Sequence, residues 1–153
     1  MEGETGGRAV KLRRKAWCQT DFPNDAIEDE EDIIQFSGRG IAAALAELLR
    51  GMGYESSEPI NGGDHGWELD VTRDGQALWC QITDMGEYCI LIFDNPTWEF
   101  SKHSKPKFIQ FIRDMGEALD KDDRFHGVRW YADDKDFQED GSGGAQFPLS
   151  GEG

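Results

Sequence analysis

The sequence predicts an α+β domain in which two helices pack on one face of an antiparallel β-meander, in the chain order α-β-β-β-β-α-β. Three observations lead to this prediction. Two stretches carry apolar residues at helical spacing, and they flank a central region. That central region alternates between apolar and polar side chains, as half-buried strands do. Short turn sequences divide it, which is typical of antiparallel neighbours.

The distribution of charge sets the predicted domain limits. The chain has 31 acidic and 16 basic side chains among 153 residues, and more than half of the net charge of -15 lies near its ends. Those ends lack periodic apolar residues. We therefore predict a largely disordered N-terminal arm at 1–32, a single α+β domain at 33–131, and a disordered acidic, Gly-rich tail at 132–153. The alternative is that aromatic side chains of the ends dock locally on the domain: Trp17, Phe22, Phe137 and Phe147.

The first helix is expected at 38–52. Ser37 is a plausible N-cap, and Gly51 and Gly53 supply the stop. One apolar stripe recurs at helical spacing, and it consists of Ile41, Ala44, Leu45, Leu48 and Met52.

The central strands follow from two turns. Asp74-Gly75 is a strong two-residue hairpin signal, and it places Leu69 opposite Cys80. A second turn at Met85-Gly86 places Cys80 opposite Leu91, so that one apolar face continues across all three strands. The same two turns also pair Trp67 with Ile82, Val71 with Leu78, Ile82 with Cys89 and Leu78 with Phe93. A short edge strand at 54–59 is expected beside Trp67.

The second helix is expected at 106–119, with Ser104 as N-cap and Pro106 in its first turn. Its apolar stripe consists of Phe108, Phe111, Ile112, Met115 and Leu119. A last strand at 127–131 completes the domain. We expect both helices to cover the face that carries Leu69, Cys80 and Leu91.

The opposite face of the sheet is the first candidate site. It would carry an aromatic and aliphatic patch bordered by polar side chains. Uncovered, such a patch marks a binding or dimer interface; covered by a helix, it is core. The partner-binding candidates are Trp79, Tyr88, Ile90, Ile92, Glu68 and Asp70.

A basic island at the start of the second helix is the anion-binding candidate. Helix N-termini attract anions, and nearby cations strengthen the attraction. The alternative is that the island pairs with Asp94 and Glu99, or with the acidic ends. The anion-binding candidates are Lys102, His103, Ser104, Lys105 and Lys107.

The remaining reactive residue types favour structural roles. Cys80 and Cys89 are expected to be buried thiols on the apolar face, whereas Cys18, beside cations in the flexible arm, is open to reaction. The loop at 61–66, which contains His65, has the composition of an ordinary turn. No catalytic signature, metal motif or cofactor-binding motif appears, so no catalytic residue, metal ligand or cofactor is assigned. The sequence therefore favours a protein without enzymatic activity over an enzyme.

These features predict a non-enzymatic, acidic protein-binding module in the cytoplasm that neutralises or escorts a basic partner, such as a toxin or a secreted effector. Net negative charge argues against nucleic acid, and no apolar stretch is long enough for a membrane span. Free cysteines without a secretory signal fit a reducing compartment. Two alternatives stay open: a small-anion or phosphate-binding domain, enzymatic or not, and a homodimer with no other activity.

Overall fold

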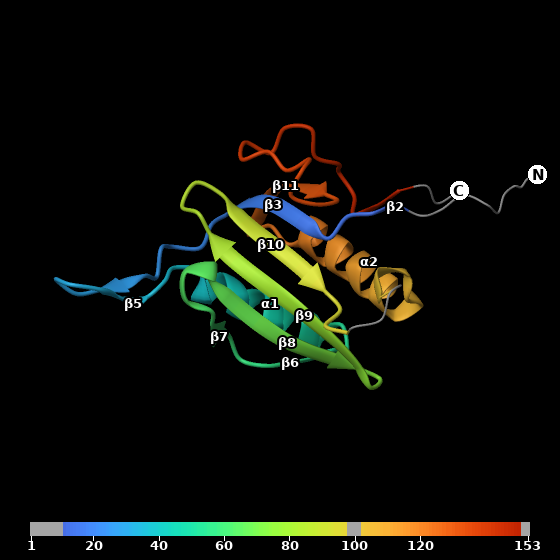
Figure 1. The fold of residues 1–153 in the computed structure, drawn as a ribbon, viewed down its shortest axis with the longest axis horizontal. Coiled ribbons are helices and arrows are strands. Elements are labelled where there is room, and N and C mark those ends of the chain that lie inside the picture. Colours follow the sequence, from blue (N-terminus) through green and yellow to red (C-terminus); the bar gives the residue numbers. More distant parts are fainter. Residues whose placement is uncertain (1–10, 98–101, 151–153) are drawn as a thin grey trace, which may run out of the picture.

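The computed structural model describes residues 11–97 and 102–150, and it confirms an α+β fold (Figure 1). A seven-stranded, antiparallel sheet has the order β11-β3-β10-β9-β8-β6, and β7 also pairs with β8. The helices α1 (Arg39–Gly51) and α2 (Pro106–Lys121) lie together behind the sheet in Figure 1. No helix in the described part of the chain is both long and apolar enough to cross a bilayer.

The first central hairpin agrees with the predicted register residue by residue. It joins β8 (Trp67–Arg73) to β9 (Gln76–Asp84), and Leu69 lies opposite Cys80. Asp74 and Gly75 have φ angles of 51° and 78°, the left-handed pair that a type I′ turn requires. The twist of this turn matches that of the strands, so a two-residue loop fixes the pairing.

The second hairpin keeps the predicted face but shifts the predicted register by two residues. Across from β10 (Cys89–Asp94), Leu91 lies opposite Ile82 rather than Cys80, and Cys89 lies opposite Asp84 rather than Ile82. The Asp84 carboxylate accepts a hydrogen bond from the Gly86 N–H at 2.9 Å, which extends the strand to Asp84 and closes a four-residue loop. An even shift leaves the same side chains buried.

Both helices have the predicted apolar faces but not the predicted caps. The expected stripe of α2 is buried throughout. The stripe of α1 is buried at Ile41, Ala44 and Leu45, whereas Leu48 and Met52 are only partly buried and Leu49, which was not predicted, is buried in their place. Gly38, with φ 113°, is the residue before α1, and the Ser37 hydroxyl instead donates to Asp84 at 2.5 Å. Lys105, not Ser104, precedes α2 and makes no side-chain cap.

Four strands lie inside the predicted disordered ends, three in the N-terminal arm and one in the tail. β3 (Lys15–Thr20) lies between β10 and β11 (Phe125–Tyr131), and it buries Ala16 and Cys18. β2 (Lys11–Leu12) pairs with β12 (Leu149–Ser150). Charged neighbours hide the short alternation in β3, because only two small side chains face the core. Residues 1–10 and 151–153 lie outside the described part of the chain, as do 98–101.

The edges of the sheet are made of short pieces. The strand expected at 54–59 is divided into β6 (Glu55–Ser56) and β7 (Ile60–Asn61), which both pair with β8. The last strand begins two residues earlier than expected and bulges after His126. A separate hairpin, β4 (Ile27–Glu28) with β5 (Ile33–Gln35), projects from the body at the left of Figure 1. Two single 3-10 turns complete the elements: η1 (Gly63–His65) and η2 (Lys102–Ser104).

Candidate functional site

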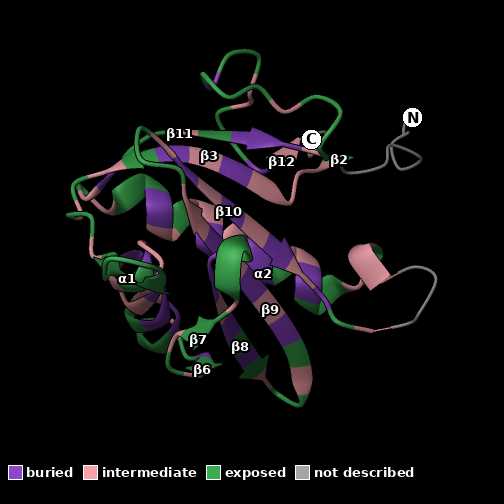
Figure 2. Ribbon diagram, turned by 60° about the vertical axis from the view of Figure 1, so that its left-hand side comes forward, coloured by how far each residue is buried: buried purple, intermediate pink, exposed green. Residues whose placement is uncertain are grey.

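The candidate site is the side of the β8–β10 meander that faces away from both helices, here called the outer face. Alternate residues along these strands are buried or partly exposed, as the bands in Figure 2 show. The inner side is buried at Trp67, Leu78 and Leu91, whereas Trp79 and Ile92 are half-buried on the outer side. The outer face therefore presents mixed side chains, whereas the buried centre of the inner face is apolar.

Trp79 lies at the centre of this face. The pairing places it directly opposite Asp70 on β8 and opposite Asp94 on β10. Its indole Nε1 donates a hydrogen bond to the Glu68 carboxylate at 3.1 Å. Trp79 therefore has three carboxylates as neighbours. The hydrogen bond to Glu68 orients the indole ring, and the apolar surface of the ring lies next to negative charge.

The aliphatic part of the face lies on β10, beside Trp79. Ile92 is opposite Gln81, and Ile90 is opposite Thr83. At the free edge of the meander, Ile60 of β7 lies opposite Glu68 and is 39% exposed. The strands thus gather five of the six predicted residues and add Ile60, which the sequence alone did not place.

Tyr88 lies apart from the other predicted residues. It is in the loop after β9, and its ring stacks on Trp17 of β3 with centroids 6.1 Å apart and planes at 19°. Trp17 is itself covered, because its Nε1 donates to the Glu139 carbonyl at 2.7 Å. The segment 132–145 therefore closes the outer face above β3, while α1 and α2 both lie on the other side of β8 to β10 (Figure 1).

One end of the outer face is fixed by the loop before β8. The His65 carbonyl accepts hydrogen bonds from Gln81 Nε2 and from the Thr83 hydroxyl, both at 2.8 Å. Gly66 is required here, since a Cβ would lie 2.1 Å from the Ile82 carbonyl oxygen. The His65 ring itself is exposed, with Asp64 at 3.7 Å, as in an ordinary turn.

The anion-binding candidates do not converge on one point. His103 Nε2 lies 2.8 Å from Asp94 Oδ1, and Lys102 Nζ lies 3.6 Å from the same oxygen. Lys107 reaches in another direction and donates to the Asp74 carbonyl at 3.0 Å. Ser104 lines a hollow with His103, and Lys105 precedes α2. The alternative pairing with Asp94 is therefore present, and Glu99 lies outside the described residues.

Asp94 is the electrostatic centre of this end of the sheet. Burial raises the pKa of its carboxyl, but other contacts outweigh burial and hold the pKa below its ordinary value. These contacts are the His103 hydrogen bond, the Asn95 N–H, and the cations Arg14 and Lys102. Asp94 therefore takes Lys102 and His103 of the basic island as its partners, whereas Glu68 and Asp70, the other acids beside Trp79, have no ion pair among the described residues.

A second polar cluster, missed by the sequence reasoning, joins α2 to β8. The Tyr54 hydroxyl donates to Asp114 Oδ2 at 2.6 Å, and Arg73 lies 3.4 Å from the same oxygen. Burial and the Asp114 carboxylate raise the pKa of Tyr54 to about 12, so the phenol stays protonated at neutral pH. Such a phenol holds a helix against a strand and is a poor base.

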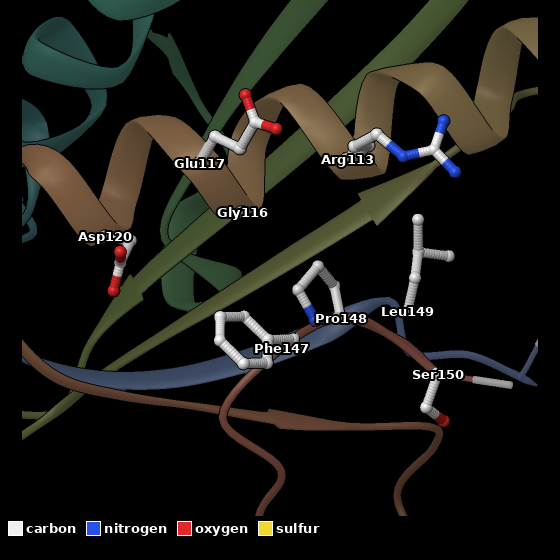
Figure 3. Close-up of a pocket in the computed structure, with 8 residues that line it drawn as sticks. All are labelled: Arg113, Gly116, Glu117, Asp120, Phe147, Pro148, Leu149 and Ser150. Atoms are coloured by element: carbon white, nitrogen blue, oxygen red, sulfur yellow. The ribbon is translucent and has the colours of Figure 1, made fainter. Parts of the chain in front are cut away.

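A cleft of about 400 Å³ lies between α2 and the C-terminal segment (Figure 3). Pro148 packs against Gly116, where a Cβ would come within 2.7 Å of Pro148 Cγ. Arg113 and Glu117 line one wall, and Phe147, 58% exposed, lines the other. The sequence reasoning could not find this cleft, because its walls are about thirty residues apart in the chain. Its charged groups have opposite signs, which selects no single class of ligand.

The cysteines are structural. Cys18 is fully buried opposite Cys89, so the expectation of an exposed, reactive Cys18 is wrong. The contact with Cys18 and then burial raise the pKa of Cys89, and burial raises that of Cys80. Raised thiol pKa values make these groups weak nucleophiles. Within residues 11–97 and 102–150, no group of three or more His, Cys, Asp or Glu side chains is placed to hold a metal.

Comparison with known proteins adds no relative. No protein-family model matches the sequence, and no curated protein and no solved structure matches it either. The function therefore has to be argued from the surface chemistry of this chain.

Proposed function

We propose that the protein is a non-enzymatic binding module that captures a basic protein partner on the outer face of its sheet, in a reducing cytoplasm. The observation that supports this most directly is the position of the helices. Both lie on the inner side, so Trp79 and Ile92 stay only half-buried, and Trp79 lies between the acidic side chains of Asp70 and Asp94. A mixed apolar and acidic surface is complementary to a partner that offers apolar side chains and cations.

Charge supports the choice of a basic partner. Glu68 and Asp70 border Trp79, and the whole chain carries a net charge of -15. A field of that sign attracts cationic proteins and repels nucleic acid. A basic toxin or secreted effector, which the module would neutralise or escort, has the required chemistry. The three buried, free cysteines are consistent with a reducing compartment.

The test is capture with matched variants. The wild-type protein, the variant Trp79→Ser with Ile92→Ser, and the control Phe147→Ser are each used to capture proteins from an extract of the cells that make the chain. Phe147 is an exposed apolar residue far from the outer face, so its loss controls for general stickiness. We expect a basic protein that binds wild type and control equally, and the outer-face variant at least about tenfold more weakly.

Salt and reconstitution decide the interpretation. Raising the salt from about 0.05 M to about 0.5 M should weaken binding of the purified partner, since exposed charges are screened over a few ångströms. Binding that is insensitive to salt, or that survives in a folded outer-face variant, contradicts the proposal. Sedimentation of the wild type alone separates the homodimer alternative, which requires self-association that Trp79→Asp abolishes.

A further inference from the structure

The β4–β5 hairpin is the least explained feature of the described structure. It leaves the body as a narrow ribbon of two short strands, Ile27–Glu28 and Ile33–Gln35 (Figure 1). A two-stranded hairpin without a core of its own is marginal in water. The segment is called the acidic hairpin below, and it comprises residues 26–35.

The acidic hairpin exposes apolar side chains that its own fold does not use. Ile27, Ile33 and Ile34 are 49%, 42% and 58% exposed. They are half of the large apolar residues that are exposed in the described part of the chain, gathered within eight positions. Isolated exposed apolar residues are ordinary, but a group on a projecting element marks a contact surface.

The same element concentrates negative charge. Five consecutive acids, Glu28 to Asp32, form its tip, and no basic side chain lies between Asp21 and Gly38. All five are exposed. An occupant must therefore bring cations together with apolar side chains, which describes a Lys/Arg-rich protein segment and excludes nucleic acid and anionic membranes.

The hairpin is held in one shape although it projects. At its tip, the Asp29 carboxylate accepts hydrogen bonds from the N–H groups of Glu31 and Asp32 at 2.9 and 2.8 Å. At its base, Gln35 Nε2 donates to the Asp25 carbonyl at 2.8 Å. A surface that is ordered before binding loses less conformational entropy when a partner docks.

The base of the hairpin is also tied to the body. The Asp25 carboxylate accepts the N–H groups of Gly38 and Gly40, both at 2.8 Å, and so serves the start of α1 in place of a local cap. The Ser37 hydroxyl donates to Asp84 at the end of β9. The acidic hairpin is therefore anchored beside one end of the β8–β10 meander, and this meander carries the outer face.

From these observations we infer that the acidic hairpin is a second docking element, which binds a Lys/Arg-rich segment with apolar side chains in the same basic partner. The inference rests on the proposed function and extends it. Ile33 and Ile34 are consecutive in β5 and point to opposite sides of the ribbon, so the segment would contact the isoleucine of one side, while Glu28, Glu30 and Glu31 would contact its cations.

The test uses defined peptides in place of the natural partner. A peptide of about eight residues, one strand's length, alternates lysine with leucine. Two control peptides replace leucine with serine, or lysine with glutamate. Calorimetry measures affinity for the full chain, and amide NMR shifts locate the contact. We expect the lysine–leucine peptide to shift the amides of residues 27–35, and both controls to bind at least about tenfold more weakly.

Two charge variants of equal net charge separate a specific contact from a general field. One carries Glu28→Gln, Glu30→Gln and Glu31→Gln, which spares the two aspartates that shape the tip. The control carries Asp120→Asn, Asp123→Asn and Glu139→Gln, all exposed and outside the hairpin. We expect about tenfold weaker binding for the first and less than twofold for the second, since a few exposed ion pairs add up to that difference.

A third variant, Ile33→Thr with Ile34→Thr, keeps the β-branched shape and removes the apolar contact. We expect it to weaken binding about fivefold. The inference is overturned if both charge variants lose affinity equally, if the isoleucine variant binds as wild type does, or if residues 27–35 show no shifts. Shifts confined to the outer face would overturn the hairpin while leaving the proposed function intact. A partner that binds the hairpin, and binds the Trp79 variant as tightly as the wild type, would overturn the proposed function while leaving the hairpin inference intact.

Discussion

The two faces of the β8–β10 meander are formed by alternate residues of the same three strands, yet they follow different rules. On the inner face the middle residues of each strand are apolar and buried, from Trp67 to Phe93, and partly exposed polar side chains stand at the strand ends, at Arg73, Gln76 and Asp84. On the outer face Trp79, Glu68 and Ile92 mix chemistries that no core would combine. The inner face is constrained by folding, so the outer face is where composition is free to serve binding.

The largest expected effect tests whether the faces differ in this way. Leu91 and Ile92 are neighbours in β10, but Leu91 is fully buried and Ile92 is not. We expect Leu91→Ala to lower the free energy of unfolding by about 3 kcal/mol, because it leaves a cavity under both helices. Ile92→Ala should cost less than about 1 kcal/mol. Denaturant unfolding measures both, and equal costs would remove the distinction between the faces.

A smaller loss of stability is expected on the helix side of the sheet, where the C-terminal segment packs against α2. A Cβ at Gly116 would overlap Pro148, so Gly116→Ala should lower stability by about 2 kcal/mol despite the better helix propensity of alanine. Gly51→Ala is the control, since that glycine in α1 has nothing within 4 Å. It should be neutral or stabilising.

The effect of Gly116→Ala is measured by thermal unfolding and by limited proteolysis of the segment 146–150. A double-mutant cycle with Pro148→Ala assigns the cost, because the two changes must be non-additive if the side chains collide. Additive costs would mean that the close approach in Figure 3 is not what restricts this position.

The smallest effect concerns Asp94, at the end of the outer face. A carboxyl whose folded pKa is lowered stabilises the fold above its ordinary pKa and loses that contribution as the pH falls through the lower, folded value. We expect Asp94→Asn to cost about 1 kcal/mol at neutral pH, through the lost charge in its hydrogen bonds with His103 and Asn95.

The difference between wild type and Asp94→Asn should begin to shrink below about pH 4, where the carboxyl of the unfolded chain becomes protonated, and should be lost once the pH falls below the lowered pKa of the folded carboxyl. Urea unfolding at neutral and acidic pH provides the measurement. A difference that stays constant with pH would show that the substitution acts through packing. In this variant Lys102 and His103 also lose the Asp94 carboxylate as a partner, so phosphate-induced amide shifts at 105–108 would revive the anion-binding alternative.

The sequence alone determined the local features. Alternation and the Asp74-Gly75 turn were enough to pair Leu69 with Cys80, and helical spacing identified every buried residue in the stripe of α2. The face on which Trp79 lies followed from the same period of two. These features depend on neighbours within about ten residues, where steric rules and turn geometry act directly.

Tertiary structure decided the rest, since those features depend on partners far along the chain. β3 enters the sheet between β10 and β11, about seventy and a hundred residues away, and its two small buried residues give too weak a local signal to predict it. Asp25 replaces the expected cap at Ser37, because its carboxylate accepts hydrogen bonds from the N–H groups of Gly38 and Gly40. The charge around Trp79 was likewise decided in space, where Asp94 pairs with Lys102 and His103, two of the residues that the sequence predicted to bind an anion.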